Sequence, residues 1–245
     1  MQFKVGFGTD IGRKRSQNQD NGAALPELGL FLVSDGMGGH RGGETASATA
    51  VEEISAYIRK APEQQNKAPS TLITNAIVSA NAAIYCKSVE DPSLHGMGTT
   101  TTALFFRDNH LTVGHVGDSR CYFLKSHAIW QATRDHSLVQ EKLRAGLISR
   151  KDVRTDRMKN VITRSVGFEK DVNVEIYQME VQQGDCFLLC SDGLSGMIED
   201  STILQIVQQH LFEGGHPQKA VDELIAAANA GGGDDNITCL IVQVT

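Results

Sequence analysis

Aspartate residues stand beside several apolar stretches of the sequence, in a pattern that suggests metal chemistry. Asp35 and Asp192 each follow an apolar run within the same Ser-Asp-Gly motif, Asp118 follows a third run, and Asp235 precedes the last one. Taken alone, an Asp-Gly pair is most simply a turn, because both residues tolerate turn geometry. Carboxylates that converge on one rim, however, repel each other unless a cation neutralises them. Oxygen ligands without a histidine or cysteine cluster favour Mg²⁺ or Mn²⁺ over zinc.

Other catalytic patterns are incomplete in this sequence. The stretch Gly36–Arg41 lies between a predicted strand and a predicted helix, but Arg41 stands where a dinucleotide fingerprint needs its third glycine. The stretch Gly193–Met197 lacks the last glycine of a serine-hydrolase elbow. No cysteine is followed six residues later by arginine, and neither H-E-x-x-H nor a G-K-[ST] phosphate loop occurs.

The amino-acid composition excludes some classes of binding partner for this protein. Lys and Arg number 23 against 29 Asp and Glu, and this net charge of -6 does not attract nucleic acid. The 5 cysteines include no C-x-x-C pair and lie mostly in apolar runs, as expected for buried thiols in a reducing compartment. No apolar run approaches the ~18 residues of a membrane span, and the N-terminus has no signal-like apolar region. We expect a cytoplasmic monomer without membrane or nucleic-acid partners.

Strands must position the aspartates, because runs rich in β-branched and aromatic residues lie beside them. We expect strands at Phe3–Thr9, Leu28–Ser34, Thr99–Phe106, His110–Val116, Arg120–Leu124, Val172–Val181, Cys186–Ser191 and Ile237–Val244. Amphipathic stretches predict helices at Glu44–Arg59, Ser70–Cys86, Ser137–Ala145, Ser201–Leu211 and Pro217–Ala230. Short polar links favour antiparallel strands, and the lack of steady βαβ alternation predicts an α+β fold. Without any linker-like segment, residues 1–245 are expected to form a single domain.

Short motifs follow one another in order along nearly the whole chain, from Gly6 to the last predicted strand. They are Arg15–Asp20, Ser34–Gly39, Gly98–Thr100, Val116–Arg120, Asp135–Ser137, Ile162–Gly167, Ser191–Leu194 and Asp235–Thr238. This ordered set resembles the protein phosphatase 2C family of metal-dependent protein phosphatases. The resemblance implies a central antiparallel β-sandwich flanked by helices on both faces, in four α-β-β-α layers. Its metals would lie in a cleft at one end of the sandwich.

The resemblance also implies roles for individual metal ligands. Asp35 would bridge two Mn²⁺ or Mg²⁺ ions, and the Gly36 carbonyl would bind one of them. Asp192 and Asp235 would hold the first metal. Asp20 would help to hold the second metal through water.

Further residues match the family pattern around those ligands, with two departures. Asp118 resembles the extra ligand that recruits a third metal in bacterial members. Arg15 resembles the phosphate-binding arginine, and Asn236 would steady the site as a neighbour of the ligands. Gln19 stands where glutamate is common, so the second metal would rely more on water. Met37 replaces the histidine that animal members carry, as in many bacterial members, so water or another group would protonate the leaving oxygen.

The implied reaction is hydrolysis of phosphoserine and phosphothreonine in proteins. The two cations would share a bridging water and lower its pKa, and the resulting hydroxide would attack phosphorus in line. The metals and the arginine would stabilise charge on the phosphate oxygens. Such an enzyme would act on phosphorylated proteins as the signalling antagonist of a serine/threonine kinase. Two alternatives stay open: a hydrolase of small phosphate esters, and a non-catalytic phosphoprotein-binding module.

Three assignments have a simpler structural alternative. Arg15 would otherwise form a surface ion pair with a nearby aspartate. His40 and His136 are candidate proton carriers, although a structural role is the simpler interpretation. Residues 144–160 fall where the family has its mobile flap, and they are rich in basic side chains. These basic residues would steer acidic or phosphorylated segments toward the metals, unless they form only a solvated loop; the foremost are Arg150, Lys151 and Arg154.

Overall fold

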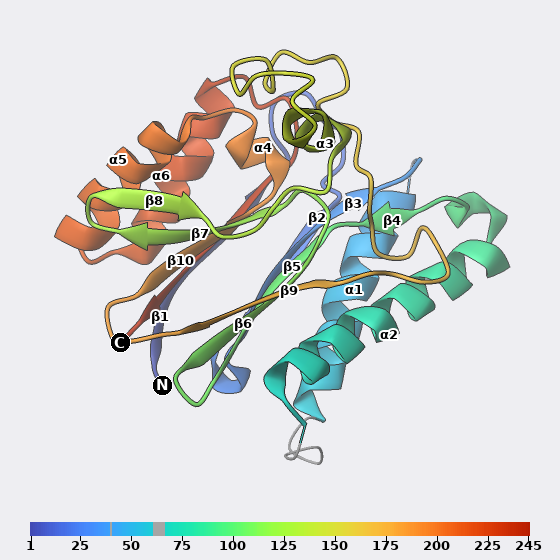
Figure 1. Cartoon of the computed structure of the whole chain (residues 1–245), viewed down its shortest axis with the longest axis horizontal. Helices are drawn as coiled ribbons and strands as arrows, with labels where there is room; N and C mark the ends of the chain where they lie inside the picture. The colour runs from blue at the N-terminus through green and yellow to red at the C-terminus, as the bar shows by residue number, and fades with distance from the viewer. Residues whose placement is uncertain (40, 61–66) are drawn as a thin grey trace.

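A computed structural model of the chain describes residues 1–39, 41–60 and 67–245. Two antiparallel β-sheets lie face to face at its centre (Figure 1). The first sheet has the order β1 (Phe3–Asp10), β11 (Ile237–Val244), β10 (Cys186–Cys190), β7 (Arg120–Lys125) and β8 (Ala128–Gln131). The second has the order β2 (Asp20–Leu25), β3 (Leu30–Met37), β5 (Thr101–Arg107), β6 (His110–Val116) and β9 (Glu175–Glu180). The short strand β4 (Gly98–Thr99) pairs with the end of β3.

Helices cover the outer face of each sheet (Figure 1). The second sheet is covered by α1 (Gly42–Arg59) and α2 (Pro69–Glu90), and the first by α4 (Asp192–Ser195), α5 (Asp200–Val207) and α6 (Pro217–Ala230). The remaining helical elements in the described residues are α3 (Leu138–Arg144), the 3₁₀ turns η1 (Pro26–Leu28) and η3 (Pro92–Leu94), and the π-helix η4 (Gln208–Glu213). The predicted α+β fold with four α-β-β-α layers is therefore confirmed.

The apolar runs of the sequence fill three layers of core. In β11, Leu240 and Val242 face the other sheet, whereas Cys239 and Ile241 face the helices. Successive side chains point to opposite faces of a strand, so a strand buried on both faces needs an unbroken apolar sequence. Between the sheets, Phe106 packs against Phe187 with ring centroids 5.8 Å apart. None of the helices in the described part of the chain is long and apolar enough to cross a membrane.

Several elements differ from the sequence prediction. Strands β2 and β8 were not predicted, and the strand expected at Val172–Val181 begins only at Glu175. The helix expected at Ser201–Leu211 changes at Gln208 into the π-helix η4. β2 carries Gly22, Ala23 and Ala24, residues of weak strand propensity, so its pairing with β3 holds it extended.

The segment after α3 contains no regular strand or helix until β9 begins. In Figure 1 its first part forms the yellow loops above α3 and α4, at one end of the two sheets, and its last part runs down past α1 and α2 to β9. Isolated bridges tie this segment to the rest of the fold, between Ile162 and Ser137 and between Val166 and Thr99. The same end of the sheets carries the ends of strands where the sequence places its aspartates.

Candidate active site

The hairpin formed by β2 and β3 brings two aspartates together. Asp20 is the first residue of β2, Asp35 lies near the end of β3, and the strand register pairs them directly. The Ser191 hydroxyl, from the opposite sheet, donates a hydrogen bond of 2.7 Å to Asp20 Oδ2. The site therefore spans both sheets at one end of the sandwich.

Hydrogen bonds from β4 and the residue after it fix the backbone of Asp35. Its N–H donates to Thr100 Oγ1 at 2.9 Å, and its carbonyl accepts from the Thr99 hydroxyl at 2.8 Å and the Thr100 N–H at 2.8 Å. At the next residue, a Cβ on Gly36 would come within 2.0 Å of the Gly43 carbonyl oxygen, so only glycine fits. The backbone that carries the Asp35 carboxylate is thus held in place.

Asp192 and Asp235 approach the same region from the other sheet. Asp192 begins α4 directly after β10, and Asp235 lies just before β11. A Cβ on Gly193 would lie 1.9 Å from the Asn236 carbonyl oxygen, so the start of α4 lies directly against the residues that precede β11. The glycine after each of the two Ser-Asp motifs is required by close backbone contact.

Asn236 binds the N-terminal loop to this site. Its side-chain nitrogen donates to the carbonyls of Ile11 and Gln17, each at 2.9 Å. Its side-chain oxygen accepts from the Gln19 N–H at 2.8 Å. One buried amide therefore positions the loop that carries Arg15.

Asp118 extends the group of carboxylates, and a buried histidine supports it. The preceding residue, Gly117, has φ of 107°, and its N–H donates to His136 Nδ1 at 3.0 Å. The proton of His136 is therefore on Nε2, which lies 3.2 Å from Glu175 Oε1. Burial lowers the pKa of His136, which favours the neutral ring. His136 is therefore held in place through both of its ring nitrogens.

We call Asp20, Asp35, Asp118, Asp192 and Asp235 the aspartate cluster. Burial raises the pKa of Asp20 to about 7 and that of Asp192 to about 6, and neighbouring carboxylates add to both shifts. Burial also raises the pKa of Asp35 and Asp118 well above the usual range, with Asp20 and Asp192 respectively as the largest repelling charges. The fold thus gathers negative charge that needs protons or cations to neutralise it.

The residues present fit hard divalent cations. Three buried carboxylate oxygens have no hydrogen-bond partner among the described residues: Oδ1 of Asp20, Asp118 and Asp192. Within residues 1–39, 41–60 and 67–245, no three carboxylate, imidazole or thiolate groups already enclose a single point. Two oxygens are engaged elsewhere, because Ser191 binds Asp20 Oδ2 and Arg15 binds Asp235 Oδ2. Ion binding would therefore require side-chain rotations that bring these carboxylate oxygens together.

Arg15 forms an ion pair with Asp235, which lies on a different loop, and not with Asp20. Its Nη2 lies 2.6 Å from Asp235 Oδ2, and its side chain is half exposed. The hydrogen bond to Asp235 raises the pKa of Arg15 and keeps its charge. The guanidinium group therefore stands at the rim of the aspartate cluster, where it can reach an incoming anion.

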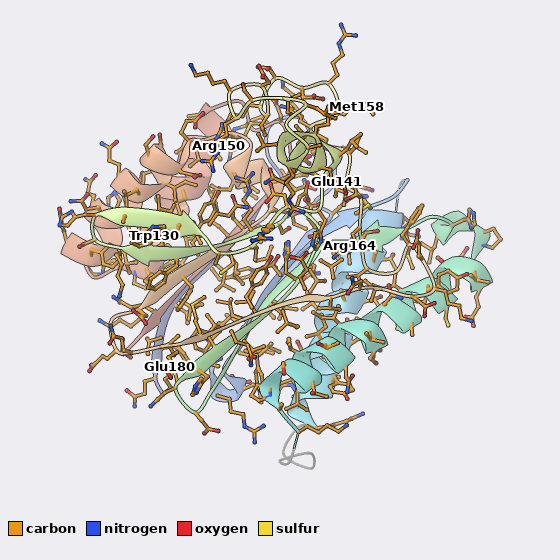
Figure 2. All side chains as sticks on the ribbon, viewed as in Figure 1. Trp130, Glu141, Arg150, Met158, Arg164 and Glu180 are labelled. Carbon is orange, nitrogen blue, oxygen red and sulfur yellow. The ribbon has the colours of Figure 1, made fainter. Side chains whose placement is uncertain are left out.

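The three basic residues of the 144–160 segment have different surroundings. Arg154 Nη2 donates to the carbonyls of Ser195 at 3.3 Å and Ile198 at 3.1 Å, and its Nη1 lies 3.1 Å from Glu199 Oε1. Arg150 and Lys151 are exposed, and neither forms an ion pair with any other described residue. Figure 2 shows Arg150 in the loops that lie above α4. Arg154 thus ties this segment to the end of α4, and the other two are available to a ligand.

Comparison with known proteins agrees with this geometry. A sequence profile described as "Protein phosphatase 2C" matches residues 7–227. The chain belongs to the protein phosphatase 2C family. It is 38% identical to the serine/threonine phosphatase stp of Listeria monocytogenes over 97% of this chain and 94% of that protein. It is 33% identical to the protein phosphatase PhpP of Streptococcus pneumoniae, over 99% and 98% of the two chains.

Solved phosphatase structures share the whole fold. The serine/threonine phosphatase PstP/Ppp of Mycobacterium tuberculosis superimposes with a TM-score of 0.91 at 31% identity, over 100% of this chain and 99% of that one. The catalytic domain of PstP in complex with two manganese ions gives a TM-score of 0.88 at 32% identity, over 99% of each chain.

Within this protein phosphatase 2C fold, sequence reasoning did not identify several supporting hydroxyl groups. Ser191, Thr99 and Thr100 hold Asp20 and Asp35 in place, and all three lie inside the motifs that carried the resemblance. Their position next to motif aspartates was the available signal. His40, the other candidate proton carrier, lies outside the described residues.

Proposed function

We propose that this protein, a serine/threonine phosphatase of the protein phosphatase 2C family, hydrolyses phosphoserine and phosphothreonine in proteins at the aspartate cluster. One observation carries the proposal: buried carboxylates with raised pKa values and unpartnered oxygens lie together beside an arginine. A site of this kind is suited to cations and, through them, to phosphate.

The proposed cofactors are two Mn²⁺ ions, as named for the related PstP catalytic domain. Asp35 would bridge them with the Gly36 carbonyl on one ion, Asp192 and Asp235 would hold the first, and Asp20 would assist the second. When bound, the ions would activate water for attack on phosphorus and neutralise charge on the phosphate oxygens.

Two finer assignments about the metals belong to the same proposal. Asp118 would recruit a third ion with Asp192, which is supported by its unpartnered Oδ1. Mg²⁺ would also serve, because every proposed ligand is a hard oxygen.

The chain's own groups would bind and orient the substrate. Arg15 would exchange its bond with Asp235 for a bidentate bond to the phosphate, since a guanidinium group matches two phosphate oxygens. Asn236 would hold the loop that carries Arg15 in register with the cluster. Met37 offers no proton, so water or another group would protonate the leaving oxygen.

The biological setting is a further part of the proposal. The enzyme would oppose a serine/threonine kinase in the cytoplasm, and all five cysteines are free thiols, which supports a reducing compartment. We propose that residues 1–245 act as one catalytic domain and as a monomer, with 144–160 as a substrate flap. Light scattering after size exclusion tests the monomeric state.

Metal-dependent turnover of phosphopeptides tests the central proposal. The protein is stripped with a chelator, and release of phosphate from phosphothreonine peptides and from a small aryl phosphate is measured with and without Mn²⁺. We expect no turnover without metal and a higher kcat/KM for peptides. Comparable or better use of the aryl ester would favour the small-ester hydrolase, whereas peptide binding without turnover would favour the non-catalytic module. Full activity after exhaustive chelation would refute the metal site.

A further inference from the structure

A cavity of about 510 Å³ lies in the segment between the flap and β9. We call it the 162–173 pocket, because its lining comes entirely from those residues. Ile162 and Val172 supply apolar surface, Phe168 is 56% exposed, and Glu169 and Asp171 supply carboxylates. None of these residues belongs to the aspartate cluster.

The shape of this pocket is fixed by contacts with α2. The buried Asn81 side chain donates to the carbonyls of Glu169 at 3.1 Å and Lys170 at 2.9 Å, and accepts from the Gly167 N–H at 2.6 Å. Gly167 has φ of 89°, and a Cβ there would lie 2.0 Å from Ile84 Cγ2. A binding site that is already ordered loses little conformational entropy when a ligand arrives.

The pocket lies a short distance from the proposed reaction centre. Gly36 pairs with Thr99, and Thr99 pairs in turn with Val166, which directly precedes the Gly167 turn. Two strand spacings of ~4.8 Å place the backbones of Gly36 and Val166 about 10 Å apart. An extended peptide covers ~3.3 Å per residue, so about three residues would reach from a phosphorylated residue at the cluster to Val166, the neighbour of the pocket-lining Ser165.

The charge of the pocket favours a cation. Arg164, its lining arginine (labelled in Figure 2), is already engaged, with Nη1 3.8 Å from Glu175 Oε1 and 3.4 Å from the Asn173 carbonyl oxygen. Glu169 and Asp171 are exposed and form no ion pair with another described residue. Lysine or arginine would rest its alkyl stem on the apolar lining, place its charge near the carboxylates and contact the Phe168 ring.

We propose that the 162–173 pocket binds a lysine or arginine side chain of the phosphoprotein substrate, about three residues from the phosphorylated residue. The pocket would thereby select substrates with a basic residue at that distance. This inference rests on the proposed phosphatase function and adds the sequence preference of the same site.

Phosphopeptides with single replacements test the pocket. A phosphothreonine peptide carries lysine, norleucine or glutamate at each position two to five residues before or after the phosphothreonine. Norleucine keeps the alkyl stem and removes the charge, so the lysine-to-norleucine ratio of kcat/KM isolates the charge. We expect a ratio of about 3 to 20 at one of these positions, as two partly exposed charge pairs and a cation–π contact would give.

Variants of the pocket carboxylates then test whether the preference for lysine arises at the 162–173 pocket. The double variant Glu169→Gln/Asp171→Asn should reduce the ratio to about 1, and Glu169→Lys/Asp171→Lys should favour the glutamate peptide. The control Glu213→Gln/Glu223→Gln removes two exposed carboxylates from η4 and α6. It changes the net charge as much as Glu169→Gln/Asp171→Asn does, and it should keep the wild-type ratio. Because each ratio is taken within one variant, losses of folding or metal binding cancel.

Two outcomes overturn the inference: a wild-type ratio near 1 at every position, or an unchanged ratio in both pocket variants. The proposed phosphatase function fails separately, if wild-type protein with Mn²⁺ hydrolyses none of the phosphopeptides.

Discussion

Asp20 and Asp35 lie directly opposite each other on the antiparallel strands β2 and β3. Opposite positions on such strands place Cβ atoms about 4.5–5.5 Å apart, where like charges destabilise the pair. Burial raises the pKa of Asp20 to about 7 and that of Asp35 well above its usual range, and the charge of Asp20 adds to the shift of Asp35. The register of one hairpin therefore creates a repulsion that a bound cation would relieve.

The first prediction concerns the metal-free protein. A carboxyl group whose folded-state pKa is raised stabilises the fold below its unfolded value near 3.8, and this contribution is lost as pH rises toward about 7 for Asp20. Asp20→Asn removes that titration, so we expect its free energy of unfolding, relative to wild type, to increase by about 1–3 kcal/mol between pH 5 and pH 8. Urea unfolding in chelator measures both proteins.

Comparing the two proteins at each pH removes other titrations. Burial lowers the pKa of His115 to about 4, so His115 stabilises the fold at high pH and this contribution falls as pH drops below 6.5, the opposite trend. That contribution is common to wild type and variant. With saturating Mn²⁺ the order should reverse, because only wild type keeps the full ligand set. A stability difference that does not change with pH would contradict the raised pKa of Asp20 on which this prediction depends.

The second prediction separates the ligands of the aspartate cluster. Asp35→Asn should lose metal binding, because its carboxylate would bridge both ions. Asp118→Asn should still bind two ions and turn over more slowly, because Asp118 would serve only the third. Calorimetric titration with Mn²⁺ counts the ions in each variant. Equal loss of metal in both variants would show that their roles are not distinct.

The elements that were predicted correctly from the sequence are those whose own residues mark where they begin and end. The bounds of β6, β11 and α6 agree with the prediction. Runs rich in apolar and β-branched residues mark the two strands, and a starting Pro217 and a following Gly231 mark the helix. β2 was missed because pairing with β3, and not its own residues, makes it a strand. The motif aspartates were identified from sequence, but the contact from Ser191 to Asp20 joins residues 171 positions apart. No local pattern specifies a contact of that kind.

The third prediction assigns different roles to the basic residues of the proposed flap, residues 144–160. Arg154→Ala should loosen the flap from α4 and lower the free energy of unfolding by about 0.5–1.5 kcal/mol, because it removes two carbonyl hydrogen bonds and a partly exposed ion pair. Arg150→Ala/Lys151→Ala should leave stability unchanged and alter the preference among acidic and neutral phosphopeptides. Thermal unfolding and peptide kinetics measure both effects. If the double variant loses peptide and aryl phosphate turnover by the same factor, these residues do not select substrates.

The last prediction concerns Arg15, whose bond to Asp235 allows two interpretations. If Arg15 grips phosphate, Arg15→Ala should lower kcat/KM about 10- to 150-fold at saturating Mn²⁺, the loss of roughly 1.5–3 kcal/mol from a charge-assisted contact. Arg15→Lys should recover only part, because an ammonium group lacks the bidentate fork. If Arg15 only orients Asp235, alanine should raise the Mn²⁺ concentration needed for half activity, and excess metal should restore the rate fully.

A neighbouring ion pair supplies the control for this comparison. Lys14 lies on the same loop as Arg15, its Nζ is 2.6 Å from Asp234 Oδ1, and both of these side chains are exposed. Lys14→Ala removes one positive charge next to Arg15 without touching Asp235, so it reports the effect of charge alone on metal and substrate. A loss of kcat/KM in Arg15→Ala that exceeds the loss in Lys14→Ala, and that persists at saturating Mn²⁺, identifies a phosphate contact. Full rescue by Mn²⁺ would instead assign Arg15 to the metal site, because only a role through Asp235 can be replaced by a higher metal concentration.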